Sequence, residues 1–369
     1  MKIIHCADLH LDARMTANLP KEKAAERKAE LLTTFNRLID YAEEQSVDAL
    51  IIAGDLFDTK RISAAAKNTV YQAIVNHPEL KFYYLRGNHD AEAFLTGLTE
   101  IPSNLHLFEK GWTTYIANPE TAGNIAITGV ELDRESSANV YADLFLARDR
   151  YNIVVIHGQD STYGAKKDAA VINLRELKNK GIDYLALGHV HGYKERALDG
   201  RGVYCYPGCL EGRGFDECGE HGFVLLTIDE QTRMCTREFV PFASRNIYEV
   251  KVDVSGCLTT AEIGECVEKA LKEADHSPRS LVKIILTGEV DVACEKEPGL
   301  LLSRYEDRFY AVKIADETRF SVDYTAYYLD ESLKGEFVRT VMNEEKLSAE
   351  EKAMIIRYGI QALAGEEVR

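Results

Sequence analysis

The chain has 369 residues, 46% of them hydrophobic, and a formal net charge of −16 at pH 7. This length accommodates one large domain and a smaller one, and the hydrophobic content excludes a mainly disordered chain. No stretch is long and apolar enough to predict a membrane-spanning helix. The strong negative charge argues against a protein built mainly to hold DNA, because phosphate contacts require local basic surfaces.

Predicted strands and helices alternate along the first half of the chain. An apolar strand at residues 2–7 precedes a long charged helix from Lys21 to about Gln45. The elements expected next are a strand at 48–53, a helix at about 64–76, a strand at 80–85, and strands at 124–130, 151–156 and 184–187. A strand rather than a signal peptide follows Met1, and the eight cysteines contain no Cys-x-x-Cys pair. We therefore expect a reduced, cytoplasmic protein.

The pattern becomes antiparallel after about residue 193. Strands are expected at 223–228 and 235–240, separated by a turn. Parallel strands with intervening helices, followed by meandering strands, predict an α/β fold. We expect two facing mixed β-sheets flanked by helices, which is an α-β-β-α sandwich.

The segment 241–245 predicts a domain boundary. Beyond it, Thr259 and Glu262 have the spacing of a capping box at the start of a helix. The elements expected here are strands at 246–254, 280–286 and 309–314 and helices at about 260–274 and 299–307. This pattern predicts a main domain at 1–243, a small α/β domain at 244–326, which the family resemblance given below implies is a capping domain, and a helical tail at 327–369.

The tail carries two amphipathic helices. Phe337, Val338 and Val341 indicate the first, and a capping box of Ser348 and Glu351 starts the second. The second helix places an apolar stripe on one face, made of Met354, Ile355, Tyr358 and Ala362. The stripe is either a partner-binding surface or a face that packs back onto its own domain, and the sequence favours neither.

Five short polar blocks follow predicted strands, where ligands gather in α/β folds. They are Asp8-Leu9-His10, Gly54-Asp55-Leu56-Phe57-Asp58, Gly87-Asn88-His89-Asp90, His157-Gly158 and Gly188-His189-Val190-His191. Each block alone has an ordinary explanation in loop or turn chemistry. Together they hold five of the ten histidines and no cysteine. Carboxylate, amide and imidazole donors suit two divalent ions such as Mn²⁺, Fe²⁺ or Zn²⁺, so the sequence predicts a two-metal site.

The order of these blocks resembles the calcineurin-like metallophosphoesterases. Within that superfamily, Asp8–Leu11, Ile51–Asp58 and the extension beyond the core most resemble the SbcD-type nuclease subunits of DNA double-strand-break repair complexes. The signature blocks cover roughly residues 1–210. Asp12 departs from that family, which usually has glycine there. It is either a turn residue or the mark of a branch with a different substrate.

The resemblance implies a role for each block. One ion would bind Asp8, His10 and His191, a second would bind Asn88, His157 and His189, and Asp55 would bridge them. Mn²⁺ is the expected metal, with Fe²⁺, Zn²⁺ and Mg²⁺ as alternatives. His89 would act as general acid or as a cation that stabilises the transition state. Asp90 would either orient His89 or cap a helix at 91–95, and Asp58 would fix the loop or support the ligands.

The resemblance also implies a substrate and partners. It predicts a nuclease that acts on DNA ends and is bound through its tail to an SbcC-type coiled-coil ATPase. It also predicts a homodimer through 64–76 and 91–98, with core packing as the alternative for these two segments. Lys60, Arg61 and Arg213 are the candidates for phosphate contacts, although for each of them a solvated surface charge is the favoured explanation. The alternatives are a phosphoesterase for nucleotides or phosphoproteins, and a scaffold for DNA or the ATPase. The complete ligand set argues against a scaffold, and the capping unit and tail argue against a small-molecule phosphatase.

Overall fold

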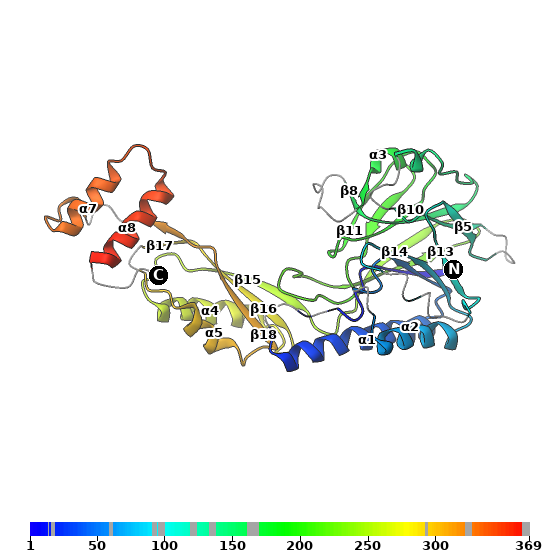
Figure 1. Cartoon of the computed structure of the whole chain (residues 1–369), viewed down its shortest axis with the longest axis horizontal. Helices are drawn as coiled ribbons and strands as arrows, with labels where there is room; N and C mark the ends of the chain where they lie inside the picture. Colours follow the sequence, from blue (N-terminus) through cyan, green and yellow to red (C-terminus); the bar gives the residue numbers. More distant parts are fainter. Residues whose placement is uncertain are drawn as a thin grey trace. The chain divides into compact units, whose positions relative to one another are not determined.

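The chain forms two compact units, Met1–Asn246 and Ile247–Arg369. The computed structural model describes residues 1–13, 15, 19–58, 62–90, 94, 100–118, 124–132, 138–160, 170–291, 294–321 and 327–363. Figure 1 shows the elements of each unit, coloured along the sequence. Among the described residues, no helix has the length and apolarity needed to cross a membrane.

The first unit contains a six-stranded sheet in the order β14-β13-β1-β2-β3-β4. Its strands are β1 (Lys2–Cys6), β2 (Ala49–Ala53), β3 (Lys81–Leu85), β4 (Leu105–Leu107), β13 (Gly222–Ile228) and β14 (Cys235–Pro241). The strands β1 to β4 are parallel, and the hairpin of β13 and β14 adds antiparallel to β1. The antiparallel pattern predicted near the end of this unit is therefore confirmed.

A second six-stranded sheet has the order β11-β12-β10-β7-β6-β5. Its strands are β5 (Thr113–Ile116), β6 (Ile125–Gly129), β7 (Tyr151–His157), β10 (Tyr184–Gly188), β11 (Lys194–Ala197) and β12 (Val203–Tyr206). The four central strands are parallel, and β5 and β11 close the edges as antiparallel partners. A short parallel pair, β8 (Gln159–Asp160) and β9 (Val171–Ile172), lies outside this sheet.

Alternating apolar side chains stack these sheets into layers. In β1, Ile4 faces the helices α1 (Lys21–Glu44) and α2 (Ala64–Asn76), whereas Ile3 faces the second sheet. The outer face of the second sheet packs against the short helices η2 (Ala138–Tyr141) and α3 (Leu174–Leu177). The predicted α-β-β-α sandwich is therefore confirmed, and Figure 1 shows α1 and α2 together on one side of it.

The second unit is built on a parallel sheet, β15-β16-β18. Its elements are β15 (Ile247–Asp253), α4 (Thr260–Ala274), β16 (Leu281–Thr287), β17 (Glu289–Asp291), α5 (Pro298–Tyr305), β18 (Ala311–Asp316), β19 (Arg319–Ser321), α7 (Leu333–Met342) and α8 (Ala349–Leu363). The predicted capping box is present, because Thr259 accepts from the Glu262 amide and the Glu262 side chain accepts from the Thr259 amide. The strand–helix alternation predicted here is confirmed.

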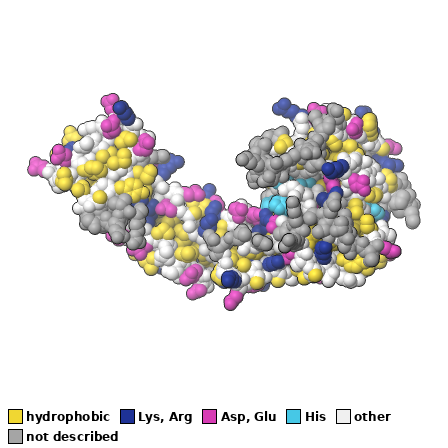
Figure 2. Space-filling view, viewed as in Figure 1, with side chains coloured by type: hydrophobic (Ala, Val, Ile, Leu, Met, Phe, Trp, Pro, Cys, Tyr) yellow, Lys and Arg dark blue, Asp and Glu magenta, His cyan; other side chains and the backbone are white. Residues whose placement is uncertain are grey.

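Helix α8 uses one face for packing and leaves the predicted stripe exposed. Ala353 and Ile356 are buried against α7. Met354 is 48% exposed, and Ile355 and Tyr358 are each 38% exposed. Figure 2 shows hydrophobic side chains gathered on the surface of this helical end. The helix therefore packs onto its own unit through a face other than the predicted stripe, and partner binding by the stripe stays a prediction.

A fully buried arginine joins α1 to the loop that follows β12. Arg27 donates from Nη2 to Glu211 Oε2 at 3.2 Å and to the Gly212 carbonyl at 2.5 Å, and its Nη1 pairs with Glu30. The other carboxylate oxygen of Glu211 accepts from Thr34 Oγ1 at 2.7 Å. Because both charges are buried, each depends on the other for compensation.

We expect Arg27→Leu to lower the free energy of unfolding of the first unit by about 3–5 kcal/mol, because it leaves the Glu211 carboxylate buried without its cation. Urea denaturation followed by circular dichroism measures this effect. Arg37→Leu, on the exposed side of the same helix, is the control and should cost no more than about 1 kcal/mol. Equal urea midpoints for the two variants would show that the buried pair of Arg27 and Glu211 stabilises the unit no more than an exposed arginine does.

Candidate metal centre

Polar side chains from both sheets meet at the carboxyl ends of their parallel strands. Asp8 and Asp55 follow β1 and β2, Asn88 follows β3, His157 ends β7, and His189 follows β10. The sheets approach each other closely here, since a Cβ added to Gly188 would lie 1.9 Å from the Ala53 carbonyl oxygen. The fold therefore places these side chains within reach of one another.

The backbone beneath the site adopts conformations that are costly for residues other than glycine. The φ angles are 53° at Asp8, 46° at His10, 51° at Asp55 and 102° at His189. Each such residue costs on the order of 1–3 kcal/mol and persists only where its surroundings fix it. Here the first two loops fix each other, because the Asp8 amide donates to Gly54 O at 3.0 Å and the His10 amide to Asp55 O at 2.9 Å.

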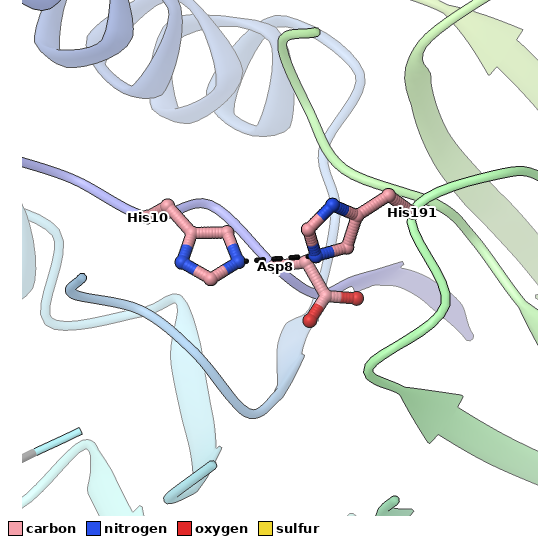
Figure 3. Close-up of side chains that lie close together, drawn as sticks. All are labelled: Asp8, His10 and His191. Atoms are coloured by element: carbon pink, nitrogen blue, oxygen red, sulfur yellow. Dashed lines mark hydrogen bonds between the residues drawn. The ribbon is translucent and has the colours of Figure 1, made fainter. Parts of the chain in front are cut away.

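The first donor cluster consists of Asp8, His10 and His191 (Figure 3). The Nε2 atoms of the two imidazoles lie 3.2 Å apart. His10 Nδ1 lies 2.9 Å from Asp58, and His191 Nδ1 donates to Glu217 Oε1 at 2.6 Å. Because a carboxylate accepts only, these contacts favour a proton on each Nδ1 and leave lone pairs on the facing Nε2 atoms.

Two imidazole Nε2 atoms that face each other beside a buried carboxylate require a proton or a metal cation between them. Asp8 is 1% exposed, and its two oxygens accept from the His189 amide at 3.0 and 2.9 Å. Burial acts to lower the pKa of His191, but the hydrogen bond to Glu217 and the charge of Asp8 outweigh it and raise that pKa. The first cluster therefore fits a divalent ion in both donor type and charge.

The second donor cluster consists of Asp55, His157 and His189, with Asn88 beside them. His157 donates from Nδ1 to Ala53 O at 2.9 Å, so Nε2 is the atom that a metal ion would bind in place of a proton. That Nε2 faces Asn88 Oδ1 at 3.0 Å and Asp55 Oδ2 at 3.4 Å. Burial acts to lower the pKa of His157, but the charge of Asp55 raises it to about 9. The second cluster thus also attracts positive charge.

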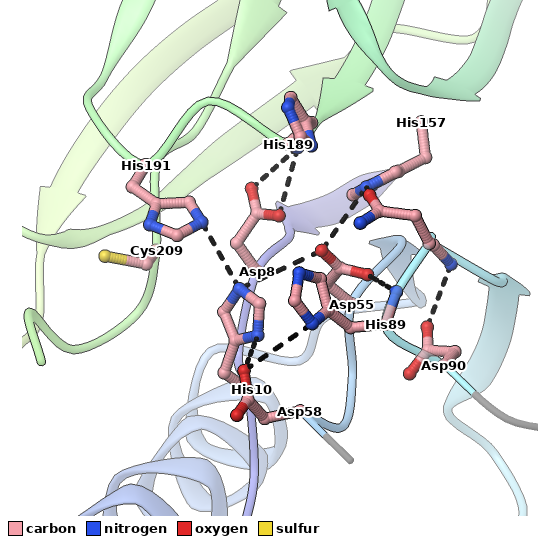
Figure 4. A network of polar contacts seen from close by, with 12 residues as sticks. Asp8, His10, Asp55, Asp58, His89, Asp90, His157, His189, His191 and Cys209 are labelled. Carbon is pink, nitrogen blue, oxygen red and sulfur yellow. Dashed lines mark hydrogen bonds and ion pairs between the residues drawn. The ribbon is translucent and has the colours of Figure 1, made fainter. Parts of the chain in front are cut away.

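Asp55 lies between the two clusters (Figure 4). Its Oδ2 is 3.4 Å from His157 Nε2 and 3.9 Å from His10 Nε2, while Oδ1 accepts from the His89 amide at 2.9 Å. This placement suits a carboxylate that bridges two ions.

His89 and its neighbour Asn88 are the exposed residues of the site. The His89 side chain is 46% exposed, and its Nδ1 lies 3.8 Å from Asp58 Oδ1. Asp90 makes contacts other than those expected, because its carboxylate accepts from the amides of Leu56, Phe57 and Gly87 at 3.2, 2.8 and 2.9 Å. Asp90 therefore fastens two ligand loops together. Residues 91–93 and 95, which the capping alternative requires, lie outside the described residues.

Asp12 makes structural contacts at the edge of the site, which favour its interpretation as a turn residue. Its carboxylate accepts from the Ser63 amide at 2.7 Å and pairs with Lys28 at 2.6 Å. Asp12 is 6% exposed and has a φ of 69°. These contacts fix the start of α2 against α1, so the turn-residue interpretation accounts for Asp12.

Of the three residues considered for phosphate contacts, the structure describes only Arg213. Lys60 and Arg61 lie outside the described residues. Arg213 is 24% exposed and binds Asp58 and Glu217. Glu217 was not foreseen, since it lies 26 residues after His191 in a loop without a recognisable motif. Only its tertiary contact with the imidazole identifies it as part of the site.

Residues 1–193 match the family model described as calcineurin-like phosphoesterase. The chain belongs to this family of phosphoester hydrolases, as its sequence predicted.

Three relatives refine the comparison. The chain is 28% identical over 235 residues to the uncharacterized metallophosphoesterase YhaO of Bacillus subtilis, covering 62% of this chain and 57% of YhaO. It is 27% identical over 272 residues to the SbcD subunit of the nuclease SbcCD of Escherichia coli K12, which covers 61% of this chain and 64% of that subunit. It is also 27% identical over 330 residues to the DNA double-strand break repair protein Mre11 of Methanopyrus kandleri, covering 79% and 69%. The chain thus spans less than two thirds of the first two relatives.

We expect Asp55→Ala to lose both ions, because the single carboxylate of Asp55 would hold both ions against their mutual repulsion. Elemental analysis of protein dialysed against Mn²⁺ should find close to two ions per chain before the substitution and almost none after it. Asp149→Ala removes an exposed carboxylate and serves as the control. Full retention of metal by Asp55→Ala would refute the bridging assignment.

Proposed function

We propose that this chain is a two-metal phosphodiesterase that cleaves DNA ends, as the nuclease subunit of an ATPase-coupled repair complex. The observation that carries this proposal is the pair of donor clusters on either side of Asp55, with the exposed imidazole of His89 beside them. The similarity to the SbcD subunit of SbcCD and to Mre11 supports DNA as the substrate.

The metal ligands in this proposal come from both sheets. Asp8, His10 and His191 would hold one ion, Asn88, His157 and His189 the other, and Asp55 would bridge them. The donors mix oxygen with imidazole nitrogen and suit Mn²⁺, Fe²⁺ or Zn²⁺, and among these Mn²⁺ is the metal that the resemblance to SbcD-type nucleases implies. When bound, the ions activate a water molecule and neutralise charge on the phosphoryl oxygens.

His89 would supply the proton that the leaving oxygen requires. Its ring lies edge-on to His10, with 5.2 Å between ring centroids, and is therefore next to the first cluster. The Nδ1 atom faces Asp58 at 3.8 Å, which makes Nε2 available to a substrate oxygen. Asp58 is shared, since the same Oδ1 lies 2.9 Å from His10 Nδ1. Asp58 would therefore orient both a metal ligand and the proton donor.

The charge of the chain favours a partner that holds the DNA. A net charge of −16 repels a polyanion, so this chain alone should bind DNA weakly. The exposed face of α8, with Met354, Ile355 and Tyr358, offers an apolar surface to a helical partner. We assign this face to an SbcC-type coiled-coil ATPase.

We expect His89→Ala to retain both ions and to lose roughly 10²–10⁴-fold in turnover, because proton transfer contributes about that much. Cleavage of end-labelled linear duplex DNA with Mn²⁺, beside hydrolysis of a small phosphodiester, measures the loss. His276→Ala in the second unit is the control. If His89→Ala loses metal, His89 is a ligand instead. Hydrolysis of the small ester without DNA cleavage, even with the ATPase present, would overturn the DNA substrate.

We expect Ile355→Asp to abolish co-purification with a co-expressed SbcC-type ATPase, because it places a charge in the centre of the exposed face of α8. Leu258→Asp changes another exposed apolar residue of the same unit, 53% exposed, and should leave the complex intact. Co-purification of both variants to the same extent would remove α8 as the docking site. Thermal unfolding followed by circular dichroism, unchanged from the wild type, confirms that both variants are folded.

A further inference from the structure

Each histidine of the first donor cluster has a carboxylate at its Nδ1. Asp58 Oδ1 lies 2.9 Å from His10 Nδ1, and Glu217 Oε1 accepts from His191 Nδ1 at 2.6 Å. Such carboxylates fix the tautomer and the orientation of an imidazole, and they make it a stronger ligand. The two come from different parts of the chain, the loop after β2 and the loop after β12.

One guanidinium connects these two carboxylates. Arg213 donates from Nη1 to Asp58 Oδ1 at 3.0 Å and from Nη2 to Glu217 Oε1 at 3.0 Å. Its backbone amide also donates to Glu217 Oε2 at 2.6 Å, and its Nε lies 3.3 Å from Oε1. The planar fork of arginine suits this arrangement, since its donors point along two fixed directions, whereas a lysine presents one point charge.

Electrostatics makes this connection necessary. Asp58 and Glu217 are like charges that lie near two further carboxylates, Asp8 and Asp55, at the same end of the sandwich. Without a cation between them, the first two would repel each other and turn away from the histidines.

The second cluster is supported in a different way. His157 donates its Nδ1 proton to a backbone carbonyl, that of Ala53, at 2.9 Å. This contact does not involve Arg213, Asp58 or Glu217. A change at Arg213 should therefore act on one cluster and spare the other.

We propose that Arg213 is a positioning residue that acts through Glu217 and Asp58 to set the affinity of the ion held by Asp8, His10 and His191. This inference rests on the proposed two-metal function and gives Arg213 a role other than phosphate contact. The guanidinium is 24% exposed, and both of its Nη atoms are engaged by carboxylates, so it faces the ligands more than the solvent.

The test is equilibrium binding of Mn²⁺ to the metal-free full chain, followed by elemental analysis and electron paramagnetic resonance. The wild type should show two binding steps and the spectrum of a coupled pair of ions, and His191→Ala identifies the step of the first cluster. Arg213→Met should weaken that step by about 10–100-fold and change the other by less than about twofold. At intermediate Mn²⁺ the variant should show the spectrum of an isolated ion.

Matched variants separate positioning from a general loss of structure. Arg201→Met breaks an equally close ion pair, with Asp183 at 2.7 Å, near the amino end of β10 and should change neither step. Arg213→Lys keeps the charge but not the fork, so wild-type affinity in this variant would overturn the bridging role. Arg213→Met combined with Glu217→Gln should weaken the step by less than the sum of the two single effects, because both act through one contact. Strict additivity would also overturn the proposal.

The remaining outcomes are equally decisive. Equal weakening of both steps in Arg213→Met would mean a general structural effect and would refute the proposal. If Arg213→Met does not fold, Glu217→Gln alone should weaken the same single step, and its failure to do so would refute the proposal as well. A wild type that binds no Mn²⁺ would instead refute the proposed function, which is a distinguishable result.

Discussion

Mutual repulsion among electron-pair donors is the constraint on which the rest of this structure depends. Strands from two sheets bring carboxylates and imidazole nitrogens to one small volume, with facing Nε2 atoms of His10 and His191 only 3.2 Å apart. The attraction of His157 and His191 for the neighbouring carboxylates offsets part of the repulsion, and the core beneath must hold the groups against the rest. The three apolar layers of the sandwich, the bonds between the ligand loops and the carboxylate of Asp90 all serve that end. A divalent cation would convert the repulsion into binding energy.

Most of the fold and the innermost part of the site could be predicted from the sequence. Buried strands leave continuous apolar runs, and their ends leave polar blocks such as Asp8-Leu9-His10, so both signals are local. The supporting contacts are not local. Glu217 orients His191 from 26 residues away, and Arg27 holds Glu211 from 184 residues away. Such pairs become neighbours only when the sheets stack, so no spacing rule reveals them.

Two residues illustrate how an accurate local pattern can still mislead about a role. Asp90 follows His89 directly, which suggests a partnership with that imidazole, yet its carboxylate binds three backbone amides of two loops. Asp12 departs from the family pattern close to the ligands, which suggests a change of substrate, yet it fixes two helices. In both cases a carboxylate near the site accepts hydrogen bonds from backbone amides, because the loops that follow strands contain amides without a partner in the sheet.

The left-handed backbone beneath the ligands has an evolutionary consequence. Glycine would adopt the φ angles of four ligand-loop residues more easily than the residues present, which are Asp8, His10, Asp55 and His189. Replacing any of them with glycine would therefore remove backbone strain but would also delete a proposed metal ligand. Selection for stability alone would therefore erode this centre, and only selection for activity preserves it. The site is a case of a stability–function trade-off. Engineering that ranks variants by melting temperature would favour the sequences that have lost the chemistry.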